Sequence, residues 1–150
     1  MFKPLGRLAS VALVPVSLFT LVLSVAAAMA QPSRAYAPIP IQAGSPVSDR
    51  LSDKDIPTGQ GGFARDYSIK LNSGDQIAID LTSENFDTII SLISTDGSTI
   101  AENDDGPDGS TNSLLFTRIN TSGTYVIRVR AFGDASGGAF TLKVTRLKPA

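Results

Sequence analysis

The chain has 150 residues, with 13 Lys and Arg against 14 Asp and Glu, and it contains no His, Cys or Trp. The absence of His and Cys excludes a Ser-His-Asp triad, a Cys-His dyad, a disulfide and a thiolate zinc site. A formal net charge of −1 provides no basic field that could hold nucleic acid. We therefore expect no nucleic-acid partner.

Residues 1–30 have the layout of a secretory signal peptide. The first seven positions carry two basic residues and no acid, an apolar stretch follows, and Ala28-Met29-Ala30 fits a small-residue cleavage site. An uncleaved membrane anchor is the alternative, since Leu8–Ala30 is long enough to span a bilayer, but Pro15 and the cleavage site favour removal. We expect a secreted protein, periplasmic or extracellular, with no membrane contact after cleavage.

Residues 31–43 are expected to form a Pro-rich linker. Pro32, Pro38 and Pro40 lie in a stretch with little periodicity of polar and apolar residues. From residue 44 to residue 148 we expect one domain, because this length suits a single core. Small exported domains often rely on disulfides, and a chain without Cys must rely on its core instead.

Alternating apolar and polar residues mark the strands of this domain. The clearest stretches are residues 67–71, 77–81, 125–129 and 140–144. A period of two is typical of strands with one buried and one solvated face. Turn sequences such as Asp96-Gly97 separate the strands, and no window after the signal peptide has helical spacing. About eight short strands predict an all-β fold, an antiparallel jelly-roll-like β-sandwich.

The stretch Ser113–Ile119 allows two registers. In one, Leu115, Thr117 and Ile119 face the core, and in the other Leu114 and Phe116 do. A slip of one residue exchanges the two faces of a strand, so the pattern alone leaves both registers open.

Nine short motifs follow one another along the chain in a characteristic order. They are Leu51-Ser52-Asp53-Lys54-Asp55, Asp66-Tyr67, Ser73-Gly74-Asp75-Gln76-Ile77, Ser83-Glu84-Asn85-Phe86-Asp87-Thr88, Asp96-Gly97, Asn103-Asp104-Asp105-Gly106, Asn112-Ser113, Ser122-Gly123-Thr124-Tyr125 and Gly138-Ala139-Phe140-Thr141-Leu142. Each motif is weak alone, but together, over about residues 44–146, they resemble the bacterial pre-peptidase C-terminal domain family, which is related to the collagen-binding domains of collagenases.

The resemblance implies a jelly-roll-like β-sandwich that accompanies secreted peptidases and other hydrolases. This chain departs from that arrangement, because no catalytic domain precedes the module. We therefore expect the mature protein to be the accessory module itself and not an enzyme. A carboxylate hydrolase built on Asp87 with Asp104 or Asp105 is the enzymatic alternative, and no cleft or aromatic platform in the sequence supports it.

An acidic loop, residues 102–109, is the candidate metal site. Its carboxylates and amide are oxygen ligands on a Gly- and Pro-broken turn, which suits calcium. The expected ligands are Asn103, Asp104, Asp105 and Asp108, with Asp87 joining from a nearby strand. The alternative is a solvated loop whose Asp side chains cap turns. The family resemblance adds an acidic N-terminal segment, where the candidate ligands are Asp49, Asp53 and Asp55.

Three further features bear on partners and on the core. A basic strip of outward cations is either a contact surface for an acidic partner or an ordinary charged face; its members are Arg118, Arg128, Arg130 and Lys143. Phe86 is expected to fill the core, with Asp87 bonded to a tight turn. No Trp is present, and Tyr67 and Tyr125 occupy inward positions, so the sequence gives little support for an aromatic platform that binds sugars.

These observations predict a secreted, non-enzymatic β-sandwich binding or accessory module that calcium stabilises and that contacts an extracellular protein or polysaccharide. The alternative is an accessory or chaperone-like partner of a separately encoded secreted peptidase or other hydrolase. The ligand and the oligomeric state are not predicted.

Overall fold

The computed structural model describes residues 36–147, with the exception of residues 108 and 134. The predicted signal peptide, the first part of the predicted linker and the end of the predicted domain lie outside this range. Ten strands occur within it. They are β1 (Ile39–Pro40), β2 (Val47–Leu51), β3 (Ile56–Pro57), β4 (Phe63–Leu71), β5 (Gln76–Thr82), β6 (Thr88–Ile93), β7 (Thr99–Asn103), β8 (Ser113–Arg118), β9 (Gly123–Ala131) and β10 (Gly138–Leu147).

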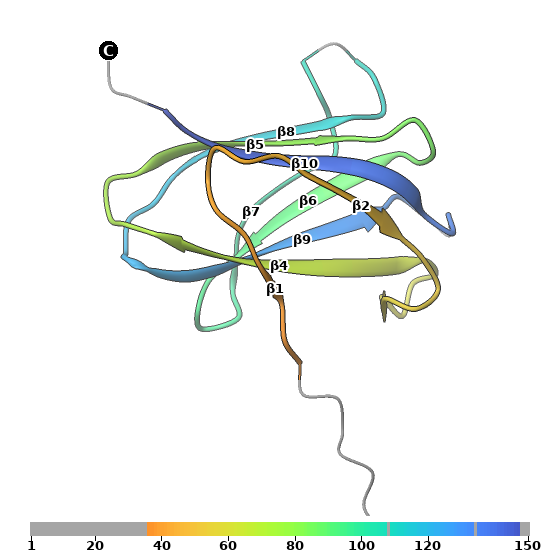
Figure 1. Ribbon diagram of the computed structural model, residues 1–150, viewed down its shortest axis with the longest axis horizontal. Coiled ribbons are helices and arrows are strands. Elements are labelled where there is room, and N and C mark those ends of the chain that lie inside the picture. The colour runs from red at the N-terminus through yellow and green to blue at the C-terminus, as the bar shows by residue number, and fades with distance from the viewer. Residues whose placement is uncertain (1–35, 108, 134, 148–150) are drawn as a thin grey trace, which may run out of the picture. The chain divides into compact units, whose positions relative to one another are not determined.

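The strands form two stacked sheets, which confirms the predicted β-sandwich (Figure 1). Sheet A has the order β1-β4-β9-β6-β7, with β3 also paired to β4, and sheet B has the order β2-β10-β5-β8. All pairs are antiparallel except β1 with β4. The two strands beyond the predicted eight are the two-residue strands β1 and β3, which are too short to produce an alternating pattern. Among the described residues no helix is long and apolar enough to cross a membrane.

The core lies between the sheets and is built from the alternating positions. Tyr67, Ile79, Ile127 and Leu142, from four different strands, are at most 1% exposed. Phe86 fills one end, as expected, and its ring packs edge-on against Phe140 at a centroid distance of 6.3 Å. Burial of such side chains is the main favourable contribution to folding.

Strand β8 adopts one of the two registers that the sequence left open. Leu115 and Ile119 are buried, whereas Phe116 is 63% exposed. The pairing of Ile79 with Leu115 across β5 and β8 places both side chains on the inner face. The register is therefore set by the partner strand, a contact that no local pattern encodes.

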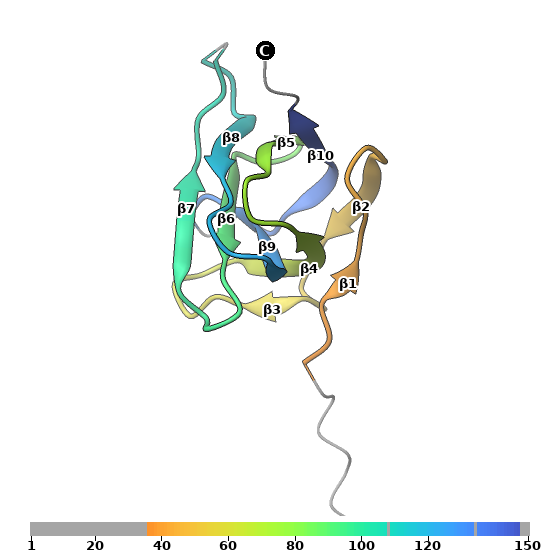
Figure 2. The same ribbon diagram turned by 90° about the vertical axis from the view of Figure 1, so that its left-hand side faces the viewer.

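Residues 36–43, within the segment predicted as a linker, pack on the sandwich. Strand β1 runs parallel to β4, and the Ile41 amide donates to the Ser68 carbonyl at 2.9 Å. The Gly44 amide then donates to Val144 in the other sheet at 2.7 Å. In Figure 2 this segment runs along one open side of the sandwich, from the edge of sheet A towards β2.

Candidate functional site

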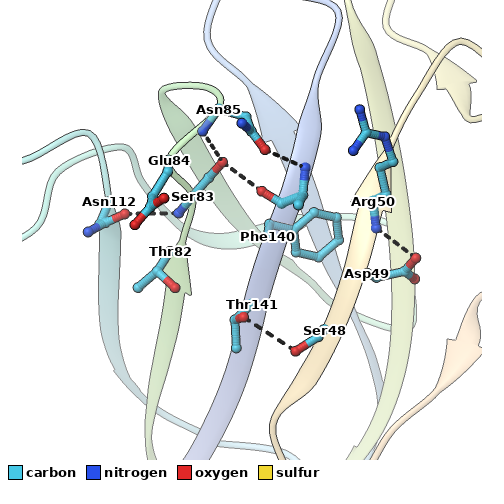
Figure 3. Close-up of a pocket in the computed structure, with 11 residues that line it drawn as sticks. Ser48, Asp49, Arg50, Thr82, Ser83, Glu84, Asn85, Asn112, Phe140 and Thr141 are labelled. Atoms are coloured by element: carbon cyan, nitrogen blue, oxygen red, sulfur yellow. Dashed lines mark hydrogen bonds between the residues drawn. The ribbon is translucent and has the colours of Figure 1, made fainter.

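A groove of about 700 Å³ lies on the outer face of sheet B, over β2, β10 and β5 (Figure 3). Its floor is a row of three hydroxyl side chains, because Thr141 of β10 is the direct cross-strand partner of both Ser48 and Thr82. The next position along β10 on this face is Ala139, opposite Arg50. Small side chains on neighbouring strands leave the hollow, and the rigid sheet holds its floor.

The loop that follows β5 forms one wall of this groove, and three hydrogen bonds hold it. The Ser83 hydroxyl donates to the Ala139 carbonyl at 2.8 Å, and the Ala139 amide donates to Asn85 Oδ1 at 2.9 Å. The Ser83 amide donates to Asn112 Oδ1 at 3.0 Å. Gly138 permits this approach, because a Cβ there would lie 2.3 Å from the Cβ of Asn85. The wall thus joins motifs that are far apart in the sequence.

Two charged side chains flank the groove on opposite sides of β10, Arg50 from β2 and Glu84 from the loop (Figure 3). Both are exposed. Neither side chain forms an ion pair or hydrogen bond with any described residue. An exposed charge without a partner inside the protein is free to meet an opposite charge on another molecule.

Asp49 lies beside Arg50 but forms part of a polar cluster that joins β2 to β4. It accepts the Tyr67 hydroxyl at 2.7 Å and pairs with Arg65, whose Nε lies 2.7 Å from Asp55 Oδ1. Burial alone would raise the pKa of the Asp49 carboxyl, but the hydrogen bonds from Tyr67 and Arg65 outweigh it and hold the pKa below 3.8. Two of the three N-terminal acids considered as calcium ligands thus bind a guanidinium.

The acidic loop is placed at the end of β7. Asn103 braces it, since its Nδ2 donates to the carbonyls of Asp105 and Leu114 at 2.9 and 2.8 Å. Asp87, Asp104 and Asp105 are exposed, and Asp108 lies outside the described residues. Asn103 and Asp104 border a hollow of about 450 Å³ that also has Phe132 on its wall. Within residues 36–147, and leaving out 108 and 134, no three acidic side chains are grouped to hold a metal ion.

Two of the four cations of the predicted basic strip form ion pairs with described residues. Arg128 makes two hydrogen bonds of 2.8 Å to Asp66, which is only 4% exposed. Arg130 pairs with Glu102 at 2.9 Å. The sequence showed these cations as outward but not their carboxylates, because the partners lie on other strands, 62 residues apart in the case of Arg128 and Asp66.

The groove is lined by hydroxyl and amide side chains and by the charged side chains of Asp49, Arg50 and Glu84. The described residues form strands and no helix. The fold and the groove together define a β-sandwich module with a surface groove. Residues 64–131 match the model of the bacterial pre-peptidase C-terminal domain, so the resemblance seen in the motifs is confirmed over these residues. Strands β2 and β10, which supply half of the groove, lie outside the matched range.

Two solved structures have similar folds. The pre-peptidase C-terminal domain of the Bacillus anthracis collagenase is 15% identical with a TM-score of 0.59, over 75% of this chain and 99% of that one. The Aeromonas hydrophila protein PliG, a periplasmic inhibitor of g-type lysozyme, is 14% identical with a TM-score of 0.54, over 73% and 95% of the two chains. At these identities the likeness establishes the fold alone. Among curated proteins none matches the sequence.

Proposed function

We propose that the chain is an exported, non-catalytic binding module that contacts an extracellular protein through the groove on sheet B. The observation that carries this proposal is the open groove flanked by Arg50 and Glu84, two charges without partners among the described residues. On sheet A, by contrast, Arg128 and Arg130 are held by Asp66 and Glu102. Binding residues on a rigid β-scaffold are the usual way for such modules to act.

The similar structures support a protein as the partner. One is a domain of a collagenase and the other inhibits a lysozyme, so this fold serves elsewhere beside or against an enzyme. A polysaccharide is less suited to the groove, because its one aromatic side chain, Phe140, is 3% exposed and offers no stacking surface. An accessory role towards a separately encoded secreted hydrolase is the second candidate, and it differs only in the identity of the partner.

We also propose that the acidic loop binds calcium through Asn103, Asp104, Asp105 and Asp108, with Asp87. The exposure of Asp104 and Asp105 at the end of β7 supports this proposal, since both carboxylates are open to a cation. The brace formed by Asn103 gives the loop a defined shape before any ion arrives.

Site-specific photo-crosslinking tests the binding role. A benzoyl-phenylalanine placed at Thr82, on the groove floor, is expected to give a discrete adduct with one extracellular or periplasmic protein in the producing cells. The control position is Thr99, an exposed residue at the start of β7 on the other sheet. Mass spectrometry of the adduct separates a secreted hydrolase from another protein. No adduct from Thr82, or the same adducts from both positions, would contradict the proposal.

A further inference from the structure

We propose that the groove on sheet B takes an extended peptide segment of the partner, with an acidic side chain set against Arg50 and a basic side chain set against Glu84. This inference rests on the proposed binding function and names the chemistry of its ligand. It comes from three features of the groove: the separation of its two unpaired charges, Arg50 and Glu84, the hydrogen-bonding groups of its rim and floor, and the absence of exposed rings from its lining.

The charge pattern of the groove is incomplete on this chain. Elsewhere on the same face, Lys143 of β10 stands directly opposite Asp80 of β5, so that cation has an acid as its cross-strand neighbour. Arg50 stands opposite Ala139, which supplies neither charge nor bulk. Opposite charges on facing positions stabilise a sheet, and Arg50 lacks this support. A carboxylate of a bound segment would supply it.

Glu84 provides the other end of the pattern. It projects from the wall loop on the far side of β10 from Arg50 (Figure 3). Ser83 and Asn85, its two neighbours, are both bonded to β10, so the backbone that carries Glu84 is held in place. An acid and an arginine whose backbones are held on either side of one strand favour a ligand with opposite charges at a matching spacing.

The rim and the floor of the groove offer the hydrogen-bonding groups that a peptide backbone needs. Asn85 and Asn112 both use Oδ1 to accept a backbone amide, which leaves each Nδ2 as a free donor at the edge of the groove. Ser48 and Thr141 hydroxyls are linked only by a long contact of 3.5 Å, so both remain able to bond elsewhere. Peptide carbonyls and amides are matched by these groups, whereas a sugar ring would find no exposed aromatic side chain to stack on.

An array of random linear dodecapeptides, acetylated and amidated at their ends, tests this inference with labelled exported protein. The bound peptides are expected to be enriched in pairs of one acidic and one basic residue several positions apart. Arg50→Glu should lower the affinity for the peptides that the wild type selects about fivefold, which is the upper end for an exposed ion pair. It should also shift the enrichment at that position from acidic to basic residues. Glu84→Lys should shift the enrichment at the other charged position of the peptide from basic to acidic residues.

The matched control is Lys143→Glu, a charge reversal on the same sheet face outside the groove, which should leave the enrichment unchanged. All three substituted positions are exposed, so the variants should fold. Peptides selected without a charge pattern, or the same pattern in wild type and Arg50→Glu, would overturn the inference. If that occurs while Thr82 still crosslinks to a protein, the binding function holds and only the ligand chemistry is wrong. If neither experiment shows binding, both fall.

Discussion

Asp66 is a buried carboxylate on the outer face of a sheet, where acids are normally solvated. Its two oxygens receive Arg128 in a two-point contact, and one of them also accepts the Tyr36 hydroxyl. Withdrawal of that hydroxyl from water, followed by its bond to Asp66, raises the pKa of Tyr36 to about 12. One side chain therefore holds a strand pair and the first described residue together.

Replacement of Asp66 by Asn should lower the free energy of unfolding by about 2 kcal/mol, because the variant removes a charge-assisted hydrogen-bond set and leaves Arg128 without its anion. Urea unfolding followed by circular dichroism measures the change. Asp53→Asn is the control, since Asp53 is exposed and bonds to no described residue, and it should leave stability within about 0.5 kcal/mol. Equal effects of the two variants would show that the Asp66 pair contributes nothing.

At the scale of elements, the junction of the wall loop with β10 is the tightest part of the groove. Gly137 and Gly138 pass beneath Leu51 and Asn85, where added Cβ atoms would lie 2.6 Å from the Leu51 carbonyl oxygen and 2.3 Å from the Asn85 Cβ. The loop cannot keep its bonds to Ala139 if β10 is pushed away. The shape of the groove therefore depends on a residue that does not line it.

Gly138→Ala should destabilise the protein by about 2–3 kcal/mol, since either the loop or the strand must move. It should also weaken crosslinking from Thr82. Gly44→Ala is the control, because its φ is also positive (+94°, against +151° at Gly138) but nothing lies within 4 Å of the added Cβ, and it should cost about 1 kcal/mol of backbone strain. A smaller loss at Gly138 than at Gly44, measured by thermal unfolding, would refute the steric argument.

The sequence predicted the elements better than the contacts between them. Alternation placed Tyr67, Ile127 and Leu142 in the core correctly, because a period of two is a property of one strand. It did not reveal the pairing of β1 with β4, since two residues are too few to show a period. The groove was also missed: Ser48, Thr82 and Thr141 meet only through the order of strands in sheet B.

At the scale of the whole molecule, acids on β2 and in the turn before β5 have pKa values below the ordinary value for an Asp carboxyl. Hydrogen bonds outweigh burial at Asp49, and the Asn72 amide and Arg146 act on Asp75. A carboxyl with a lower pKa in the folded than in the unfolded protein contributes stability above the unfolded value, and this is lost as the pH falls towards the folded value. The protein should therefore lose stability in acid.

Asp49→Asn should make this loss less steep. In urea unfolding between pH 6 and about pH 2.5, the wild type is expected to lose stability below about pH 4, the usual range of an Asp carboxyl. The variant starts from a lower stability, because it weakens the contacts to Arg65 and Tyr67, and its curve should be flatter. Parallel curves for wild type and variant would show that Asp49 does not drive the acid response.

If the acidic loop binds calcium, the stability of the whole domain should depend on the calcium concentration. Thermal unfolding of residues 31–150 should show a midpoint several degrees higher in millimolar calcium than in EDTA, since a ligand of the native state stabilises it. The double variant Asp104→Asn with Asp105→Asn should abolish the rise. A midpoint that stays constant up to millimolar calcium would show that the loop is a solvated turn.

The position of β10 also governs when this protein can fold. It lies between β2 and β5, although it follows all the other described strands in sequence. Sheet B therefore lacks one of its central strands until residues 138–147 have been synthesised. Until then Phe86 also lacks its edge-on contact with Phe140. Pairing that waits for distant sequence is slow, and the incomplete chain keeps its apolar strands exposed. A chain that lacks β10 should therefore stay unfolded, and folding of this module should begin only once residues 138–147 are available.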